Sequence, residues 1–190
     1  SAKAVAANIH LMADRMTSLA LDDRLGGSND VQLSMLQETR STYEFYGLGI
    51  YGLDGTAQAV DGETYENLAE TEWFALLQES DNLTIADPLV TDEYVGIPMG
   101  MPVKTDGETS AYLVGVYKYD MLSDVLGTIH IGQSGMALII NEKGKIVGHP
   151  MEEIVMQGRE LTQFVSDVTW YLRNLLLVKT TDDVEDVLDV

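Results

Sequence analysis

Two long apolar runs joined by a short polar segment constrain the fold of this chain more than any other feature. The runs are Tyr94–Val103 and Ala111–Tyr119, and the segment between them carries Asp106 followed by Gly107. Asp-Gly between two strand-like runs favours a β-hairpin, because glycine readily adopts the positive φ that a tight turn needs. The sequence therefore predicts a long hairpin around which the rest of the chain is arranged.

The two faces of the first hairpin strand differ in bulk, since side chains alternate along a strand. One face carries large apolar side chains: Val95, Ile97, Met99, Met101 and Val103. The other face carries Tyr94, Gly96, Pro98, Gly100 and Pro102. Because this second face is nearly bare, we expect a packed helix or a ligand to come close to it. Each proline lacks an N–H group, so it must lie at a bulge or face away from a pairing neighbour.

Composition narrows the classes of function. The 190 residues are 45% hydrophobic, which is enough for the core of one domain or two small ones. No apolar run reaches the about 18 residues of a membrane-spanning helix, so any anchoring or targeting segment is expected outside this chain. The net charge of −20 argues against nucleic acid and anionic lipid as partners. The lack of cysteine excludes disulfides, thiolate zinc sites and cysteine nucleophiles.

A helix is expected over residues 3–25, followed by a break at Gly26 and Gly27. Its apolar residues follow the spacing of a coiled-coil seam: Val5, Ile9, Met12, Met16 and Leu19. Two readings stay open. The stripe forms either the seam of a homodimer or the face by which the helix packs on its own sheet.

The remaining pattern predicts helices and strands in alternation. We expect helices at 31–42, 72–79 and 121–129, and strands at 46–53, 57–60, 83–85, 136–141 and 145–148. Thr71 is the expected N-cap of the second of these helices. The last two strands repeat the layout of the first two, which predicts the same sheet unit twice, with a linker over 130–135.

Several motifs, in this order, resemble the bacterial double Cache sensor family. They are Asp54-Gly55, Glu70-Thr71-Glu72-Trp73-Phe74, Ile85-Ala86-Asp87-Pro88, Met101-Pro102-Val103, the run 135–150 ending in His149-Pro150, and Trp170-Tyr171-Leu172 as the start of a last strand. The resemblance implies an α+β fold with a long N-terminal helix and two PAS-like units built on antiparallel sheets. The expected parts are a helical stalk (1–45), a membrane-distal ligand-binding unit (46–130) and a short or truncated membrane-proximal unit (131–190).

The family implies an extracytoplasmic small-molecule sensor of a bacterial membrane receptor, namely a chemoreceptor, a histidine kinase or a diguanylate cyclase. The chain itself would be soluble and would relay its signal to a cytoplasmic output domain. In the amino-acid-binding branch, an arginine two residues before the tryptophan holds the ligand carboxylate. Thr71 stands there in this chain and cannot form a charge-assisted bidentate clamp. Tyr117 stands where that branch has an aspartate for the ligand amine, so an α-amino acid is disfavoured.

What remains is an aromatic and acidic site, expected as a cavity between the Trp73 helix and the central hairpin. Its candidate residues are Tyr65, Thr71, Trp73, Phe74, Asp92, Tyr94, Tyr112, Tyr117 and Tyr119. Aromatic faces and a carboxylate suit a small neutral or cationic ligand. The alternative is that Trp73 and Phe74 are core residues and that the tyrosines are ordinary strand residues.

Catalysis has little support in the sequence. None of the histidines, His10, His130 and His149, has an evident catalytic partner nearby in the chain. Phosphate-binding, zinc-protease and EF-hand motifs are missing. We therefore expect no catalytic residue, metal site or cofactor. The rival hypothesis is a protein-interaction domain that dimerises through Val5–Leu19 and has no ligand cavity.

Overall fold

The computed structural model describes residues 2–129, 137–141, 143–158, 162–163 and 165–170. These residues form two antiparallel sheets with helices packed around them, so the expected α+β class is confirmed. The expected linker at 130–135 lies outside the described residues. Trp170, expected at the start of a last strand, instead belongs to a helical stretch and is 65% exposed.

The main sheet has the order β2-β1-β6-β5-β3, with β4 also paired to β5. Its strands are β1 (Phe45–Tyr51), β2 (Ala57–Gly62), β3 (Thr84–Ile85), β4 (Leu89–Val90), β5 (Val95–Thr105) and β6 (Glu108–Lys118). The hairpin β5–β6 lies at its centre and pairs from Gly96 and Lys118 to Thr105 and Glu108. Both turn residues have positive φ, 54° at Asp106 and 86° at Gly107, as the Asp-Gly signal requires.

Both prolines of β5 turn the side that lacks an N–H toward the short strand β3. The carbonyl of Pro98 accepts a hydrogen bond from the Ala86 N–H, which lies just beyond the end of β3. Pro102 is four residues along the same strand and therefore faces the same side, past the other end of β3. Both prolines therefore face away from β6, which pairs along the length of β5, and toward the side on which β3 pairs at only two positions.

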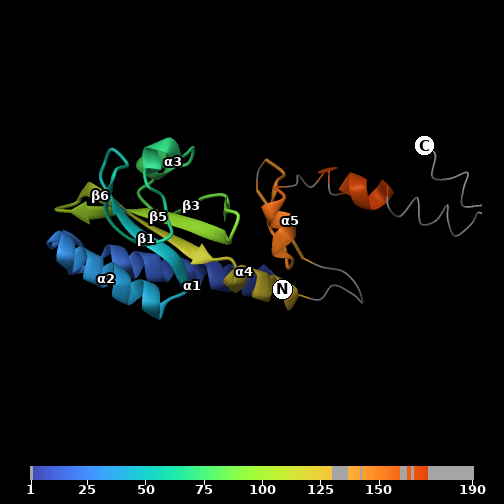
Figure 1. The fold of residues 1–190 in the computed structure, drawn as a ribbon, viewed down its shortest axis with the longest axis horizontal. Coiled ribbons are helices and arrows are strands. Elements are labelled where there is room, and N and C mark those ends of the chain that lie inside the picture. Colours follow the sequence, from blue (N-terminus) through green and yellow to red (C-terminus); the bar gives the residue numbers. More distant parts are fainter. Residues whose placement is uncertain (1, 130–136, 142, 159–161, 164, 171–190) are drawn as a thin grey trace, which may run out of the picture.

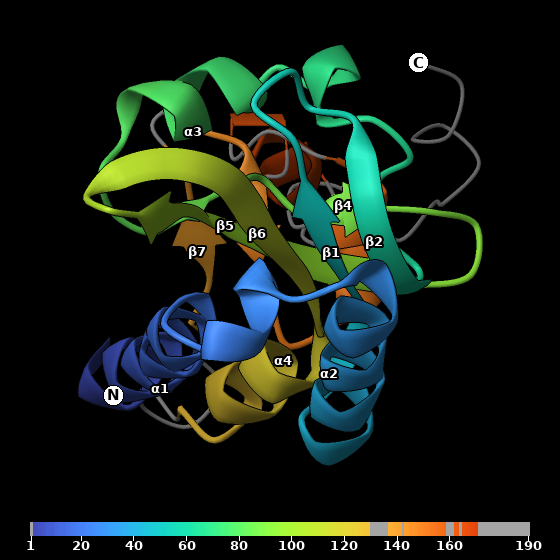
Figure 2. The same cartoon turned by 90° about the vertical axis from the view of Figure 1, so that its left-hand side faces the viewer.

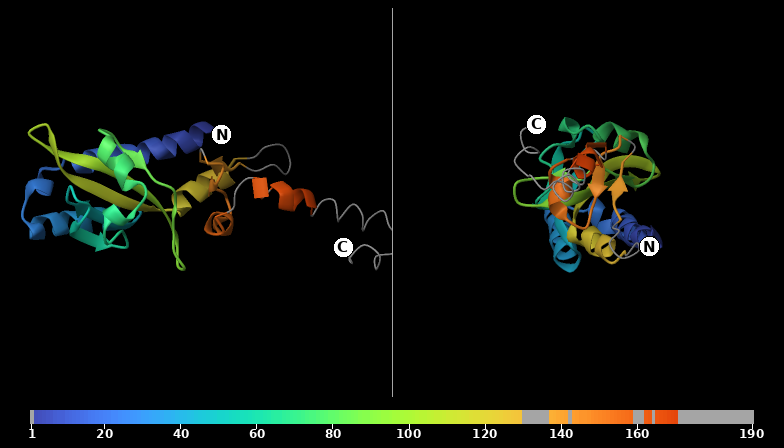
Figure 3. Two further views of the ribbon diagram at one scale, coloured as in Figure 1. Left: turned by 90° about the horizontal axis from the view of Figure 1, so that it is seen from above. Right: turned by 90° about the vertical axis from the view of Figure 1, so that its right-hand side faces the viewer.

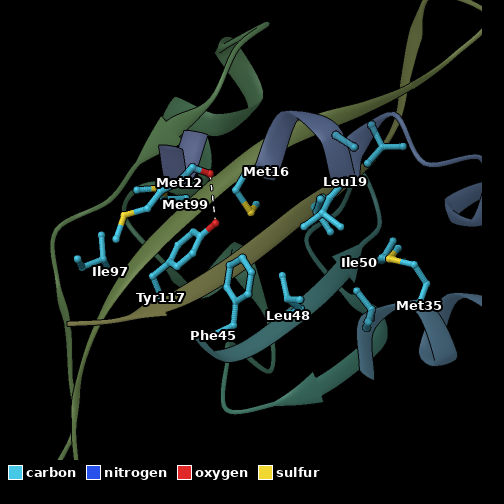
Figure 4. Close-up of a cluster of buried hydrophobic side chains, with 14 of the residues drawn as sticks. Met12, Met16, Leu19, Met35, Phe45, Leu48, Ile50, Ile97, Met99 and Tyr117 are labelled. Atoms are coloured by element: carbon cyan, nitrogen blue, oxygen red, sulfur yellow. Dashed lines mark hydrogen bonds between the residues drawn. The ribbon is translucent and has the colours of Figure 1, made fainter. Parts of the chain in front are cut away.

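One face of the main sheet is covered by α1 (Ala2–Ala20), α2 (Asn29–Thr42) and α4 (Asp120–Gly127) (Figure 2). Within this core Met12 is 1%, Met16 0% and Leu19 9% exposed, and all three face β-strand residues such as Met99 and Leu48 (Figure 4). The second reading of the helical stripe is therefore right for these three residues. The first helix ends at Ala20 rather than residue 25, and Asp22 caps a separate 3-10 turn, Asp23–Gly26.

The opposite face carries the 3-10 turn Leu68–Glu70 and the short helix α3 (Phe74–Glu79) (Figure 1). Gly100 of β5 allows this close approach, because a Cβ there would lie 2.9 Å from the Trp73 ring and 3.0 Å from Leu77. A helix thus packs on the bare strand face, which is one of the two outcomes expected from the sequence. The helix begins later than expected, with Trp73 rather than Thr71 as its N-cap.

A small second sheet follows, made of β7 (Ile139–Ile140) and β8 (Ile146–Gly148), with α5 (Glu152–Met156) beside it (Figure 3). It docks on the main sheet through buried contacts of Tyr119 with His149. The Glu152 carboxylate also accepts a hydrogen bond from the Val95 N–H at 3.0 Å. Across the described residues, no helix combines the length and the apolar character needed to span a lipid bilayer.

Candidate ligand-binding site

Aromatic side chains gather on the face of the main sheet beneath α3. The Tyr65 and Trp73 rings lie 5.9 Å apart, and Phe74 meets Tyr112 edge-on at 5.6 Å. Burial raises the pKa of Tyr65 to about 12, and burial also raises the pKa of Tyr112. Both phenols therefore stay protonated at neutral pH and keep their hydrogen-bond donors. We call Tyr51, Tyr65, Trp73, Phe74 and Tyr112 the aromatic cluster.

Trp73 is the most informative member of this cluster. The residue is 9% exposed, and its buried indole N–H makes no hydrogen bond of good geometry among the described residues, although Trp73 lies near enough to the Tyr65 hydroxyl to act on the pKa of that phenol. A buried donor left unpaired costs about 1–3 kcal/mol. The N–H is therefore available to an acceptor atom brought by a ligand or by water.

The space above the hairpin at Trp73 is not the cavity expected from the sequence. Trp73 and Leu77 fill the space over Gly100, because glycine has no side chain to hold them away from the strand. The pocket that touches Trp73 lies beside α3 and has a volume of about 280 Å³. It is lined by Glu72, Trp73, Leu76, Ile85, Ala86 and Asp87 on one side and by Asn141 and Lys143 on the other. We call it the junction pocket.

The second side of the junction pocket comes from the turn between β7 and β8. The side-chain amide of Asn141 donates hydrogen bonds of 3.0 Å to both carboxylate oxygens of Asp87. Sequence reasoning missed Asn141 and Lys143 as site residues. They follow Asp87 by more than 50 positions, so only the docking of the second sheet reveals their proximity.

A larger cleft of about 390 Å³ lies between α1 and α2, and both of its arginines are already engaged. The Arg24 guanidinium forms ion pairs with Asp22 and Glu38, both at 2.7 Å. The Arg15 guanidinium lies 4.8 Å from the centre of the Tyr43 ring. Among the described residues, no group of His, Asp or Glu side chains is arranged to hold a metal ion.

No family model matches this chain. Solved structures do. The ligand-binding domain of the Pseudomonas fluorescens chemoreceptor CtaA with L-isoleucine has a TM-score of 0.63 at 18% identity, covering 82% of this chain and 67% of that one. The corresponding domain of Pseudomonas aeruginosa PctB with L-Arg has a TM-score of 0.66 at 16% identity, covering 82% and 68%. That of PctC with GABA has a TM-score of 0.59 at 20% identity, covering 82% and 71%.

The chain has the double Cache fold. Within this fold, four of the sequence-predicted site residues come together in the aromatic cluster, namely Tyr65, Trp73, Phe74 and Tyr112. Tyr94 lies nearby, where its ring stacks on Tyr46 at 4.0 Å, and it contributes to the raised pKa of Tyr65. Thr71 bonds to the Leu68 carbonyl, and Asp92 is exposed in the loop between β4 and β5.

Two predicted residues lie on the other face of the double Cache sheet. Tyr117 and Tyr119 are an odd number of positions from Tyr112. Their side chains therefore point to the opposite face of the sheet, toward α1, α2 and α4 and away from α3. The Tyr117 hydroxyl donates to the Met12 carbonyl at 3.2 Å (Figure 4), and the Tyr119 hydroxyl donates to the His149 carbonyl at 2.9 Å. Both hydroxyls are therefore used in the core and are separated from the aromatic cluster by the sheet.

Proposed function

We propose that this chain is the small-molecule sensing domain of a bacterial transmembrane receptor and that it works on the extracytoplasmic side of the membrane. The fold supports this proposal, because solved domains with the same fold are ligand-binding domains of chemoreceptors. The observation that carries it is the buried indole N–H of Trp73, which has no hydrogen bond of good geometry within the part of the chain that the structure describes. The proposal assigns no catalysis to the chain.

The proposed ligand is a small molecule without net negative charge that presents an acceptor atom to Trp73. The basic groups considered from the sequence are already engaged. Lys104 pairs with Asp81 at 2.9 Å, and the Lys118 ammonium lies 5.7 Å from the Tyr46 ring centre. Thr71 supplies no charge. Aromatic faces with carboxylates around them favour neutral or cationic ligands.

Signal relay is proposed to pass from the main sheet to the second sheet through β6. That strand ends at Lys118, and Tyr119 directly after it is bonded to His149. A ligand changes such a relay only when it binds two conformations of the domain with different affinity. The expected division of the chain at residues 45 and 130 into stalk, distal unit and proximal unit is kept as part of this proposal.

Homodimerisation through the N-terminal helix is also kept as a proposal, in a reduced form. Met12, Met16 and Leu19 are buried in the core of their own chain. Val5 and Ile9 are half-buried, and they line an apolar groove with Leu126 and Ile139. A dimer seam on this helix would therefore be limited to its first half.

A thermal-shift screen of neutral and cationic metabolites tests the proposed function. A ligand that binds only the folded state stabilises it by RT ln(1 + [L]/Kd), so a hit raises the melting temperature. Trp73→Phe keeps a large ring and removes the N–H, and we expect it to reduce the shift caused by any hit. Trp170→Phe is the matched control, because Trp170 is exposed and far along the chain. A broad library without any hit would refute the sensing function.

A further inference from the structure

A cleft of about 210 Å³ lies on the helix side of the main sheet, where the second sheet docks. Its inner wall is formed by Ile9 and Met12 of α1, Ile97 and Met99 of β5 and Leu122 of α4. Met12 is 1% and Met99 0% exposed, and Figure 4 shows both on the same side of the sheet as Ile97. We call this space the inter-sheet cleft.

The outer wall of the inter-sheet cleft comes from the second sheet and from the end of β3. Ile139 of β7 and Val147 of β8 line it, and Ile139 also packs against the core of the main sheet. Ile85 is 46% exposed, so the cleft opens to solvent on this side. Trp73 and the rest of the aromatic cluster do not line it, which separates this space from the proposed Trp73 site.

The side chains around the inter-sheet cleft offer little to a polar or charged molecule. Among the described residues, Asp87 and Asn141 are its only polar lining side chains, and the Asn141 amide already donates to both Asp87 oxygens. No basic side chain of the described residues lines the cleft, so an anion would have no counter-charge. A buried water needs about two to four polar partners, which these side chains do not supply. The walls therefore favour an uncharged, apolar occupant.

We propose that the inter-sheet cleft binds a small uncharged apolar molecule, about the size of a benzene ring with one short alkyl group. An apolar cavity of about 150 Å³ holds benzene, so a volume of about 210 Å³ leaves room for a slightly larger molecule. Met12 and Met99 suit this occupant, because methionine side chains adapt their shape and make favourable contacts with aromatic rings. This second site goes beyond the proposed function and does not depend on Trp73.

An occupant of the inter-sheet cleft contacts both sheets, with β5 on one side and Ile139 and Val147 on the other. The apolar surface that it buries would add to the Tyr119–His149 contact in holding the second sheet on the main sheet. Binding therefore favours the docked arrangement over any arrangement in which the sheets separate. The measurable consequence is a higher melting temperature when the cleft is filled.

Isothermal titration calorimetry and thermal shift of the purified chain test this proposal, with toluene as the probe. Benzoate and benzylamine carry the same ring with a negative or a positive charge. We expect toluene to bind and to raise the melting temperature, and both charged analogues to bind at least about tenfold more weakly.

Two variants of the second sheet separate binding in the cleft from binding elsewhere. Val147→Phe puts a ring into the cleft and should weaken toluene binding about tenfold or more. Ile140→Phe is the matched control, because Ile140 lies on the paired strand, is 45% exposed and does not line the cleft. It should leave the affinity for toluene unchanged, as should Trp73→Phe.

A gentler variant keeps the test decisive if Val147→Phe fails to fold. Ile97→Val shortens one side chain of the inner wall and should raise the affinity for propylbenzene relative to toluene about threefold or more. An unchanged ratio, absent toluene binding, equal binding to Val147→Phe, or charged analogues that bind as well as toluene would overturn the proposal.

The inter-sheet cleft and the proposed sensing function fail separately. If toluene does not bind while a screened metabolite stabilises the chain through Trp73, the second site is refuted and the sensing function stands. If toluene binds in the cleft and no screened metabolite stabilises the chain, the second site stands and the sensing function is refuted.

Discussion

The hydroxyl of Tyr119 donates a hydrogen bond of 2.9 Å to the His149 carbonyl and accepts one of 2.6 Å from the His149 N–H. Tyr119 is fully buried, and His149 is 2% exposed. A single phenol at the end of β6 therefore satisfies both backbone groups of one residue of the second sheet. This contact docks the second sheet on the main sheet together with the hydrogen bonds from Val95 to Glu152 and from Asn141 to Asp87.

Tyr119→Phe removes both of these buried hydrogen bonds to the His149 backbone. We expect a loss of about 1–3 kcal/mol in the free energy of unfolding, because each intramolecular hydrogen bond contributes about 0.5–1.5 kcal/mol. Urea denaturation followed by circular dichroism measures it. Tyr43→Phe is the control, since its ring stays under Arg15 and its stability should stay within about 0.5 kcal/mol. Equal stabilities for the two variants would contradict the role of Tyr119.

Alkaline pH should destabilise the fold through its buried tyrosines. Burial raises the pKa of Tyr51, Tyr65 and Tyr119 from 10.0 to about 12. Because the folded-state pKa lies above the unfolded value, the stability that these groups contribute is complete below pH 10.0 and is lost as pH rises toward about 12. Urea midpoints measured at about pH 9 and about pH 11 should fall, and Tyr51→Phe should reduce the fall. A midpoint that rises or stays constant over this interval would refute the prediction.

Gly100→Ala should push α3 away from the sheet. The new Cβ would meet the Trp73 ring at 2.9 Å and Leu77 at 3.0 Å, so we expect a loss of about 1–3 kcal/mol from overpacking. Thermal unfolding measures the loss. Gly127→Ala is the matched control, because nothing lies within 4 Å of its Cβ position at the end of α4 and alanine favours helix. A Gly100 variant as stable as the Gly127 variant would show that α3 does not pack tightly on β5.

Met16→Ala tests whether the apolar stripe of α1 belongs to the fold of its own chain. Met16 is fully buried in the core, so truncation should cost about 2–5 kcal/mol at any protein concentration. Leu11→Ala is the control, because Leu11 is 47% exposed and should cost far less. Chemical denaturation at two widely separated protein concentrations separates the readings. A cost for Met16→Ala that vanishes at low concentration would instead indicate a dimer seam.

Local signals were sufficient where one residue type has a strict geometric consequence. Asp106-Gly107 predicted the central hairpin, since the turn needs positive φ at both positions. The bare side of β5 predicted the close approach of a helix or a ligand, and a helix packs there at Gly100. The alternation of strand side chains was available too, and applying it to β6 would have separated Tyr117 and Tyr119 from Tyr112.

Other features depend on contacts between distant segments and leave no local pattern. Lys143 lies in an ordinary polar turn and lines the junction pocket only because β7 and β8 dock near Asp87. The stripe of α1 has the same spacing for a dimer seam as for a sheet-packing face. The surface on which this stripe packs is formed by the main sheet. The sequence of α1 alone therefore does not show which of the two it meets.

The central claim is that Trp73 contacts the ligand, and its fluorescence reports this most directly. The chain has two tryptophans, so Trp170→Phe leaves Trp73 as the sole tryptophan reporter. Titration of this variant with any ligand found in the metabolite screen should change the intensity or wavelength of Trp73 emission, with a midpoint equal to the calorimetric Kd. A screened ligand that binds with full affinity and leaves the emission of Trp73 unchanged would contradict the account.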